Sequence, residues 1–353
     1  MRLNDDPLVA FAREALALGR RMMAGGPSRR YRLPFAAVDL TATDDAYVQA
    51  CDRALATDDG PDGGSPAAAP LRLRICVADA RALGLGASPA WWEPTYGAVV
   101  FERRLEAAGL SGAYWHDGRM WTFFDRATGE GVQVLSHAGS WPPWEAASPL
   151  RLFLALAHLA AGRRLVHAAT LGRAGRGVLI AGQGGAGKSG TTLAGIAAGL
   201  DTAGDDYVLV DPGPRGEGGV SVHPVYRLAK QDRTGLARLG LAHLAAATPP
   251  NWQGKHEFDV AAIGGGRVGA LRLTSILMPR IAGAAATTLT PASPRDAMLA
   301  LAPSSVFQIP GERASALPFF AGLARRLPSF RLDLGHDPAE IAGVIDAFIA
   351  QQP

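Results

Sequence analysis

The sequence predicts an α/β domain with a mixed β-sheet at residues 148–353, preceded by a smaller α+β domain at residues 1–147. In the C-terminal part, an apolar segment at 177–181 runs into a glycine-rich loop, and a helical pattern and a second apolar segment follow. This alternation of strand and helix is typical of α/β folds. Another apolar segment, at 165–171, lies close before the first. So short a connection favours an antiparallel hairpin, and therefore a sheet of mixed direction.

The N-terminal domain is predicted from its own patterns. Residues 7–24 carry apolar side chains at helical spacing, and Gly25 ends that helix. Asp117-Gly118 separates two short aromatic-rich segments, which predicts a β-hairpin whose aromatic residues form sheet core. Residues 58–70 are of low complexity and are predicted to be a loop. No residue before position 148 belongs to a motif with recognisable chemistry.

The boundary between the two domains is placed near residue 147. Ser148 and Pro149 are typical of an N-cap and a first helical position, so they predict a helix that runs to about residue 162. The same pattern at Asp337-Pro338 predicts a final helix that ends near Ala350. A length of 353 residues also favours two domains.

Composition excludes several classes of protein. The formal net charge is only +3, and no run of Lys and Arg alternates with aromatic residues, so a nucleic-acid surface is not expected. Cys51 and Cys76 are too few for a disulfide framework or a zinc site and are read as buried thiols. No segment is typical of a signal peptide or of a membrane span, so the expected location is the cytoplasm.

The glycine-rich loop matches the Walker A, or P-loop, pattern G-x-x-x-x-G-K-[ST]. Glycines let successive backbone N–H groups turn inward around a polyphosphate, and the N-terminus of the following helix adds positive charge. Lys188 would reach the β- and γ-phosphates of ATP, and the Ser189 hydroxyl would bind Mg²⁺. A chance turn in a chain with 43 glycines is the alternative. The residues predicted to contact nucleotide are Gly182, Gln183, Gly184, Gly185, Ala186, Gly187, Lys188, Ser189 and Gly190.

Two acidic sites could supply the metal ligand and the base that phosphoryl transfer from a bound nucleotide needs. Asp205-Asp206 precedes the apolar segment 207–210, and adjacent carboxylates there would titrate as a coupled pair. One could bind metal while the other accepts a proton from an attacking hydroxyl. Asp211 follows the same apolar segment and is the competing Walker B candidate, although the Pro-Gly-rich sequence after it is also typical of a turn. These residues alone leave both candidates open.

The order of His167, the glycine-rich loop and Asp205-Asp206 resembles the catalytic domain of the HPr kinase/phosphorylase family. It is more similar still to the broad group of HPr-kinase-like serine kinases, some of which accompany biosynthetic clusters for modified peptides, including lasso peptides. Segments 226–230, 254–255 and 327–337 resemble downstream parts of that group. The resemblance covers about residues 148–353.

The resemblance implies roles for individual residues. Asp205 becomes the catalytic base and Asp206 a carboxylate on the metal side, with His167 hydrogen-bonded to Asp205. Lys188 acts on the phosphates, and Lys230 and Lys255 are candidate phosphate contacts. Arg227 is a weaker one. The implied cofactors are ATP and Mg²⁺.

One departure limits what the resemblance implies. The Arg-Gly-Leu-Gly stretch that the family associates with its phosphorylase reaction is missing, and residues 221–226 stand in its place. The HPr substrate, the phosphorylase reaction and the hexamer are therefore not expected. The expected function is an ATP-dependent serine kinase acting on a peptide or protein, with substrate presentation by the N-terminal domain as a hypothesis. Alternatives are a kinase of a small hydroxylated metabolite and a nucleotide switch or ATPase that depends on Asp211.

Overall fold

The computed structural model describes residues 6–57, 70–86, 98–115, 120–213, 219–308 and 313–352. The chain divides into two compact units, the first reaching Ala160 and the second beginning at Ala161. The sequence places this boundary near residue 147. The hairpin turn predicted at Asp117-Gly118 and nearly all of the loop predicted at 58–70 lie outside the described residues.

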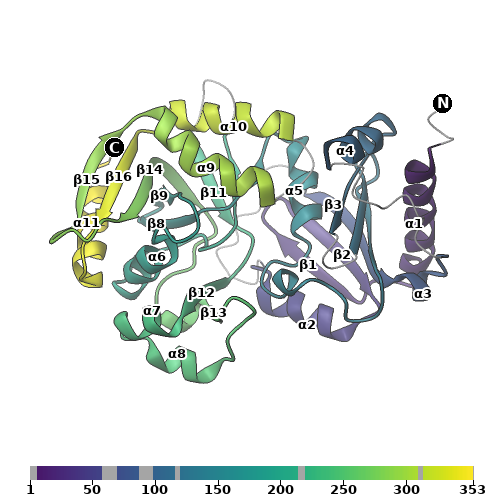
Figure 1. Ribbon diagram of the computed structural model, residues 1–353, viewed down its shortest axis with the longest axis horizontal. Helices are drawn as coiled ribbons and strands as arrows, with labels where there is room; N and C mark the ends of the chain where they lie inside the picture. Colours follow the sequence, from purple (N-terminus) through teal and green to yellow (C-terminus); the bar gives the residue numbers. More distant parts are fainter. Residues whose placement is uncertain are drawn as a thin grey trace. The chain divides into compact units, whose positions relative to one another are not determined.

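The first unit contains β1, β2 and β3, labelled in Figure 1, in a six-stranded mixed sheet. The strand order is β1-β2-β3-β6-β5-β4. The pairs β2/β3 and β3/β6 are parallel, and the other pairs are antiparallel, including the predicted β4/β5 pair. Trp121, Phe123 and Phe124 are buried in this unit, which confirms their interpretation as sheet core. Its elements are α1 (Pro7–Met23), β1 (Arg29–Leu33), β2 (Ala36–Ala42), α2 (Asp45–Ala54), β3 (Leu71–Asp79), α3 (Ala80–Leu83), α4 (Ala98–Ala107), β4 (Leu110–Trp115), β5 (Met120–Asp125), β6 (Glu130–Leu135), η3 (Pro143–Ala146) and α5 (Arg151–Leu159).

Helix α5 begins later than its sequence predicts. Its N-cap is Leu150, which has a left-handed backbone (φ 58°), so the assignment of Ser148 as N-cap and Pro149 as first helical residue is wrong. The buried carboxylate of Glu145 accepts a hydrogen bond from the Leu150 backbone N–H at 3.3 Å and thereby holds the turn before the helix. Phe153 of α5 packs on Phe124 of β5, with ring centroids 6.2 Å apart, which ties this helix to the first unit.

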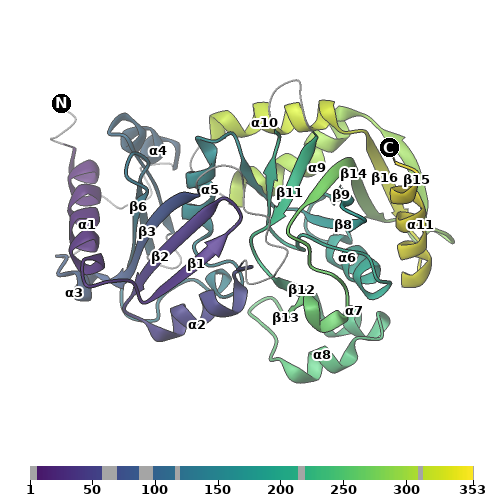
Figure 2. The same ribbon diagram turned by 180° about the vertical axis from the view of Figure 1, so that it is seen from behind.

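The second unit contains an eight-stranded mixed sheet with helices on both faces (Figures 1 and 2). One path through the sheet runs β15-β16-β14-β11-β10-β7, and β9 joins it between β14 and β8. The pairs β9/β14 and β14/β16 are parallel, whereas β8/β9 is the antiparallel hairpin that the sequence predicts. Its elements are β7 (Arg164–Val166), β8 (Ala169–Arg173), β9 (Arg176–Ile180), α6 (Lys188–Ala197), β10 (Val208–Asp211), β11 (Val220–Pro224), β12 (Leu228–Asp232), α7 (Arg233–Arg238), α8 (Ala242–Ala247), β13 (Lys255–Asp259), η4 (Val260–Ile263), β14 (Leu271–Ile281), β15 (Thr288–Ala292), α9 (Pro294–Gln308), α10 (Arg313–Arg326), β16 (Ser329–Leu334) and α11 (Pro338–Ala350).

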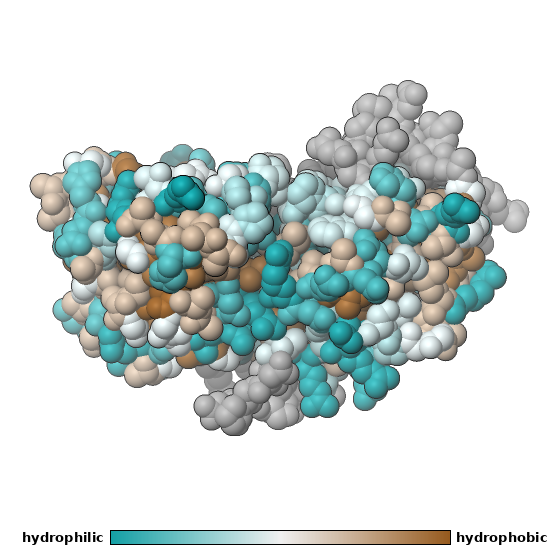
Figure 3. Space-filling model, turned by 90° about the horizontal axis from the view of Figure 1, so that it is seen from below, coloured by the Kyte–Doolittle hydropathy of each residue, from teal (hydrophilic) through white to brown (hydrophobic). Residues whose placement is uncertain are grey.

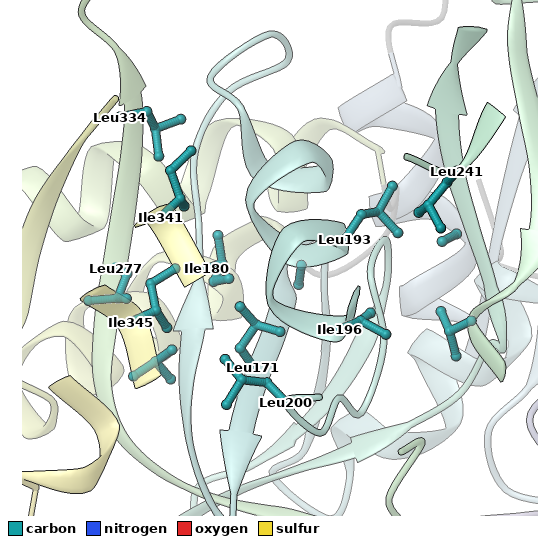
Figure 4. Close-up of a cluster of buried hydrophobic side chains, with 14 of the residues drawn as sticks. Leu171, Ile180, Leu193, Ile196, Leu200, Leu241, Leu277, Leu334, Ile341 and Ile345 are labelled. Atoms are coloured by element: carbon teal, nitrogen blue, oxygen red, sulfur yellow. The ribbon is translucent and has the colours of Figure 1, made fainter. Parts of the chain in front are cut away.

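Strand β9 is buried on both faces, which accounts for its continuous apolar sequence. Val178 and Ile180 belong to a core with side chains of α6 and α11, drawn in Figure 4. Leu179 belongs to a second core with side chains of α9 and α10. Packing on both faces holds β9, and with it the start of the glycine-rich loop, in a rigid part of the unit. Helix α11 begins and ends as predicted, with Asp337 as N-cap.

The segment predicted as one strand at 165–171 is two short strands. β7 pairs with β10, whereas β8 pairs with β9. His167 and Ala168 lie between the two strands, where the chain changes its partner. This change carries His167 to the start of β10, beside Asp206.

Candidate functional site

The glycine-rich loop, residues 182–189 and hereafter the glycine loop, connects β9 directly to α6. Helix α6 begins at Lys188, inside the glycine loop. Gly185 (φ 83°) and Gly187 (φ 103°) have left-handed backbones that favour glycine. The Lys188 Nζ donates to the carbonyl oxygens of Gly182 at 2.7 Å and Gln183 at 3.2 Å, so its ammonium group lies over the loop. The loop, the helix N-terminus and the cation together form a surface that suits an anion.

Gly187 offers a test of how tightly the glycine loop is built. A Cβ at Gly187 would lie 2.6 Å from the Leu334 Cδ1, and the φ of 103° strains any other residue. We expect Gly187→Ala to lower the free energy of unfolding by about 1–3 kcal/mol, measured by chemical denaturation. Gly184→Ala is the matched control, because a Cβ there meets no atom within 4 Å. Equal stability of the two variants would contradict this account of the loop.

Buried hydroxyl groups hold the backbone that leads into Asp205. The Thr170 hydroxyl of β8 accepts a hydrogen bond from the Ala203 backbone N–H at 2.8 Å. The Thr202 hydroxyl accepts one from the Gly204 backbone N–H at 2.9 Å, and Gly204 has a φ of 151°. The Thr170 backbone N–H also donates to the Gly204 carbonyl oxygen at 3.0 Å. The aspartates are therefore positioned by β8, next to the strand that leads into the glycine loop.

Asp205 is a buried carboxylate with spare hydrogen-bonding capacity. The residue is only 3% exposed, and its Oδ1 has no hydrogen-bond partner. Oδ2 accepts a long hydrogen bond of 3.5 Å from the Lys230 backbone N–H. Burial and the neighbouring charge of Asp206 raise the pKa of Asp205 to about 6, although Ser189 and Lys188 act in the opposite direction. Asp205 thus lies beside the end of the glycine loop with a pKa suited to proton transfer near neutral pH.

Asp206 differs from Asp205 in its contacts and in the direction of its pKa shift. The His167 Nε2 lies 3.0 Å from Oδ1, and the Lys230 Nζ lies 2.8 Å from Oδ2. Burial favours the neutral form, but the charge of Lys230 and the hydrogen bond from His167 outweigh it and hold the pKa of Asp206 well below 3.8. The two adjacent carboxylates therefore differ in basicity, as groups with separate roles in catalysis often do.

One expectation for this cluster is wrong, the partner of His167, whereas phosphate binding by Lys230 stays a prediction. His167 lies beside the aspartate pair, but its imidazole contacts Asp206 rather than Asp205. Lys230, expected as a phosphate contact, forms an ion pair with Asp206 in this structure. Both differences arise because the break between β7 and β8, and the docking of β12, bring these side chains to the Asp206 side of the pair.

Two residues that contact His167, Ser305 and Tyr207, were not predicted from the sequence. The His167 backbone N–H donates to the Ser305 hydroxyl of α9 at 3.1 Å. The Tyr207 ring lies against the imidazole, with centroids 5.0 Å apart. Tyr207 directly follows Asp206 in the sequence, but a buried tyrosine at a strand start carries no signal of its own. Ser305 lies far from His167 along the chain, so only the fold brings the two residues together.

Two of the remaining predicted contacts, Lys255 and Gly190, lie at the first turn of α6. Lys255 of β13 is close enough for its charge to act on Lys188, whose pKa is lowered mainly by burial, while the two aspartates partly offset that effect. A Cβ at Gly190 would lie 3.7 Å from the Gln231 side chain of β12. Arg227, in contrast, is directed to Asp259, with the closest nitrogen and oxygen 3.9 Å apart.

Asp211 occupies a different place from the aspartate pair. It lies at the far end of β10, about 16 Å along the chain from Asp206 at ordinary strand rise. Its Oδ2 accepts from the Arg163 Nε at 2.8 Å, and its Oδ1 accepts from the Gly213 backbone N–H at 2.9 Å. The second contact is that of a turn-initiating aspartate, the structural alternative that the sequence left open.

The described part of the chain contains no cluster of three or more His, Cys, Asp or Glu side chains arranged to hold a metal ion. The helices within the described ranges are also too short or too polar to cross a membrane.

On the face of the molecule drawn in Figure 3, hydrophilic and hydrophobic residues are interspersed.

Comparison with known proteins yields little. No protein-family model matches the chain, and no curated protein does. One matching solved structure is that of the Hpr(Ser) kinase/phosphatase from Coxiella burnetii, with 14% sequence identity and a TM-score of 0.28. The match covers 53% of this chain and 97% of the other. A TM-score this low supports no conclusion about fold or activity.

Proposed function

We propose that the second unit is an ATP-dependent kinase that transfers the γ-phosphoryl group to a serine-type hydroxyl of a peptide or protein. One observation carries the proposal: the glycine loop with Lys188 lies beside two adjacent aspartates of different basicity, Asp205 buried and Asp206 half-buried. A phosphate-binding loop supplies the donor site, and a carboxylate with a pKa near 6 supplies the base that transfer to a hydroxyl needs. The resemblance to HPr-kinase-like serine kinases in the sequence supports the same reaction.

The residues present fit a magnesium nucleotide. A Cβ at Gly184 or Gly185 would meet no atom within 4 Å, so the loop backbone is open there, and the Asp205 Oδ1 is a buried oxygen without a partner. Ser189 would supply a hydroxyl ligand to Mg²⁺, and Asp206 would act on the metal side, directly or through water. When bound, Mg²⁺ would neutralise charge on the phosphates.

In the proposed mechanism, Asp205 accepts the proton of the acceptor hydroxyl as the new O–P bond forms. The bond between the γ-phosphorus and its bridging oxygen breaks, and the electron pair leaves with ADP. Lys188 and the loop amides stabilise the negative charge on the phosphoryl oxygens. Asp206, held by His167 and Lys230, remains ionised and keeps these two side chains in place beside the base.

The proposal is tested by incubating the protein with ATP, Mg²⁺ and serine-containing peptides, and following phosphopeptide by mass. We expect phosphopeptide with the wild type and with Asp211→Asn, because Asp211 is engaged by Arg163 and Gly213 away from the aspartate pair. Phosphorylation of small hydroxylated compounds alone would instead indicate a metabolite kinase. ATP hydrolysis that is indifferent to every acceptor and is lost in Asp211→Asn would replace the kinase with a nucleotide switch or ATPase.

A further inference from the structure

The parallel strands β9, β14 and β16 direct their carboxyl ends toward the same edge of the sheet, and the glycine loop follows β9 at that edge. β9 and β16 are both parallel to β14, with Ile180 paired to Leu277 and Ile281 paired to Leu334. In α/β sheets, ligands bind outside the carboxyl ends of parallel strands. The last residue of β14, Ile281, therefore lies at the edge where a bound nucleotide is expected.

Ile281 is unusually accessible for a large apolar residue. It is 70% exposed, the highest value among the large apolar residues in the part of the chain that the structure describes. It also borders the glycine loop, because a Cβ at Gly187 would lie 3.5 Å from the Ile281 Cγ1. An apolar side chain exposed next to a ligand loop gains stability when a ligand covers it.

The chain after Ile281 extends this apolar surface. Residues 282–286 are Ala-Gly-Ala-Ala-Ala, and they are exposed or half-buried. The end of the segment is fastened to α11: the Thr287 hydroxyl donates to the Glu340 carboxylate at 3.0 Å and accepts from the Gly335 backbone N–H at 2.9 Å. Residues 281–286, hereafter the alanine ledge, thus end at a fixed point, and their side chains carry no hydrogen-bonding group.

The two sides of β9 are chemically different. On one side, β8 holds the segment that leads into Asp205, and Lys230 binds Asp206 there. On the other side, β14 ends in the alanine ledge. If the reacting phosphate is directed to Asp205, the other end of an extended nucleotide lies toward β14.

We propose that the alanine ledge is the contact surface for the nucleoside of the bound nucleotide, and that this contact discriminates little between purine bases. The inference rests on the proposed function and specifies its donor substrate. An apolar ledge can pack against the face of any purine, whereas discrimination of adenine from guanine requires hydrogen bonds to the base edge.

The test measures binding to the full-length protein by calorimetry, with ATP, GTP and inorganic tripolyphosphate as probes in the presence of Mg²⁺. Ile281→Ala is expected to weaken ATP and GTP about fivefold and to leave tripolyphosphate unchanged, because only the nucleosides cover the side chain. Ile281→Leu should bind all three probes as the wild type does. Leu299→Ala, at a 58% exposed residue of α9, is the control for loss of an exposed apolar side chain.

The outcomes separate this inference from the proposed function. Wild-type affinities for ATP and GTP within about threefold of each other, together with a nucleoside-specific loss in Ile281→Ala, support it. If Ile281→Ala leaves the ATP affinity unchanged, or if the wild type strongly prefers one purine, the proposed role of the alanine ledge is wrong. Phosphate binding by the glycine loop is not affected by either result. Failure of the wild type to bind either ATP or tripolyphosphate overturns the proposed function as well.

Discussion

Asp205→Asn is expected to reduce phosphoryl transfer by a factor of about 10² to 10⁴ while the affinity for ATP stays within a few-fold of wild type. Asparagine has nearly the shape of aspartate but cannot accept the hydroxyl proton. The wild-type kcat/KM should also rise with pH through about 6, because it follows ionisation of the base in the free enzyme. Phosphopeptide formation measured by mass, beside Asp211→Asn as control, checks the first expectation. A loss smaller than tenfold would remove Asp205 from the role of base.

The same substitution should stabilise the folded protein at high pH. Burial raises the pKa of Asp205 from 3.8 to about 6, so the folded state holds this proton more tightly than the unfolded state. Wild-type stability therefore falls as the pH rises between these two values and stays lowered above them. The shift corresponds to about 3 kcal/mol, which Asn would recover at pH 8 and not at pH 4. Chemical denaturation of both proteins at the two pH values measures the difference, and equal stability at pH 8 would contradict the burial cost.

Lys188→Met carries the second large expected effect. Removing this ammonium group should weaken Mg-ATP binding about 10- to 100-fold and reduce transfer about 10²-fold or more, because a charge-assisted contact to the phosphates is lost. The loss of Lys188 also removes a positive charge that lowers the pKa of Asp205, so the base would ionise less readily. Calorimetry with ATP and with tripolyphosphate measures the binding.

The control for Lys188 is Lys255→Met. Lys255 is also a cation near the first turn of α6, but its side chain makes no contact with the loop carbonyls that Lys188 binds. A smaller loss is therefore expected, below about tenfold. Equal affinities for the two variants would show that the glycine loop binds phosphate through general positive charge and not through Lys188.

Much of this architecture is local in the sequence and was predictable for that reason. The β8/β9 hairpin, the glycine loop and the capped helix α11 each depend on residues close together in the chain. The turn at Asp211 also matches its local signal, since the aspartate bonds to a backbone N–H two residues later. The mixed direction of the sheet follows from the same hairpin.

What was not predictable depends on contacts distant in sequence. The partner of His167 is set by a break between β7 and β8, and the sequence of residues 165–171 does not reveal that break. The ion pair of Lys230 with Asp206 depends on how β12 docks against the aspartates. Leu150 adopts a left-handed backbone because Glu145 holds its N–H, which overrides the cap signal of Ser148.

The hydrogen bonds of the Thr170 and Thr202 hydroxyl groups affect the free energy of ligand binding as well as the position of Asp205. They hold the backbone before Asp205 through hydrogen bonds inside the protein, so this segment is ordered before any ligand arrives. The conformational entropy of that segment is lost during folding, and it does not have to be subtracted again from the binding free energy. If the proposed function holds, contacts with the phosphates contribute to affinity without this ordering cost, and the acceptor substrate meets Asp205 already in place.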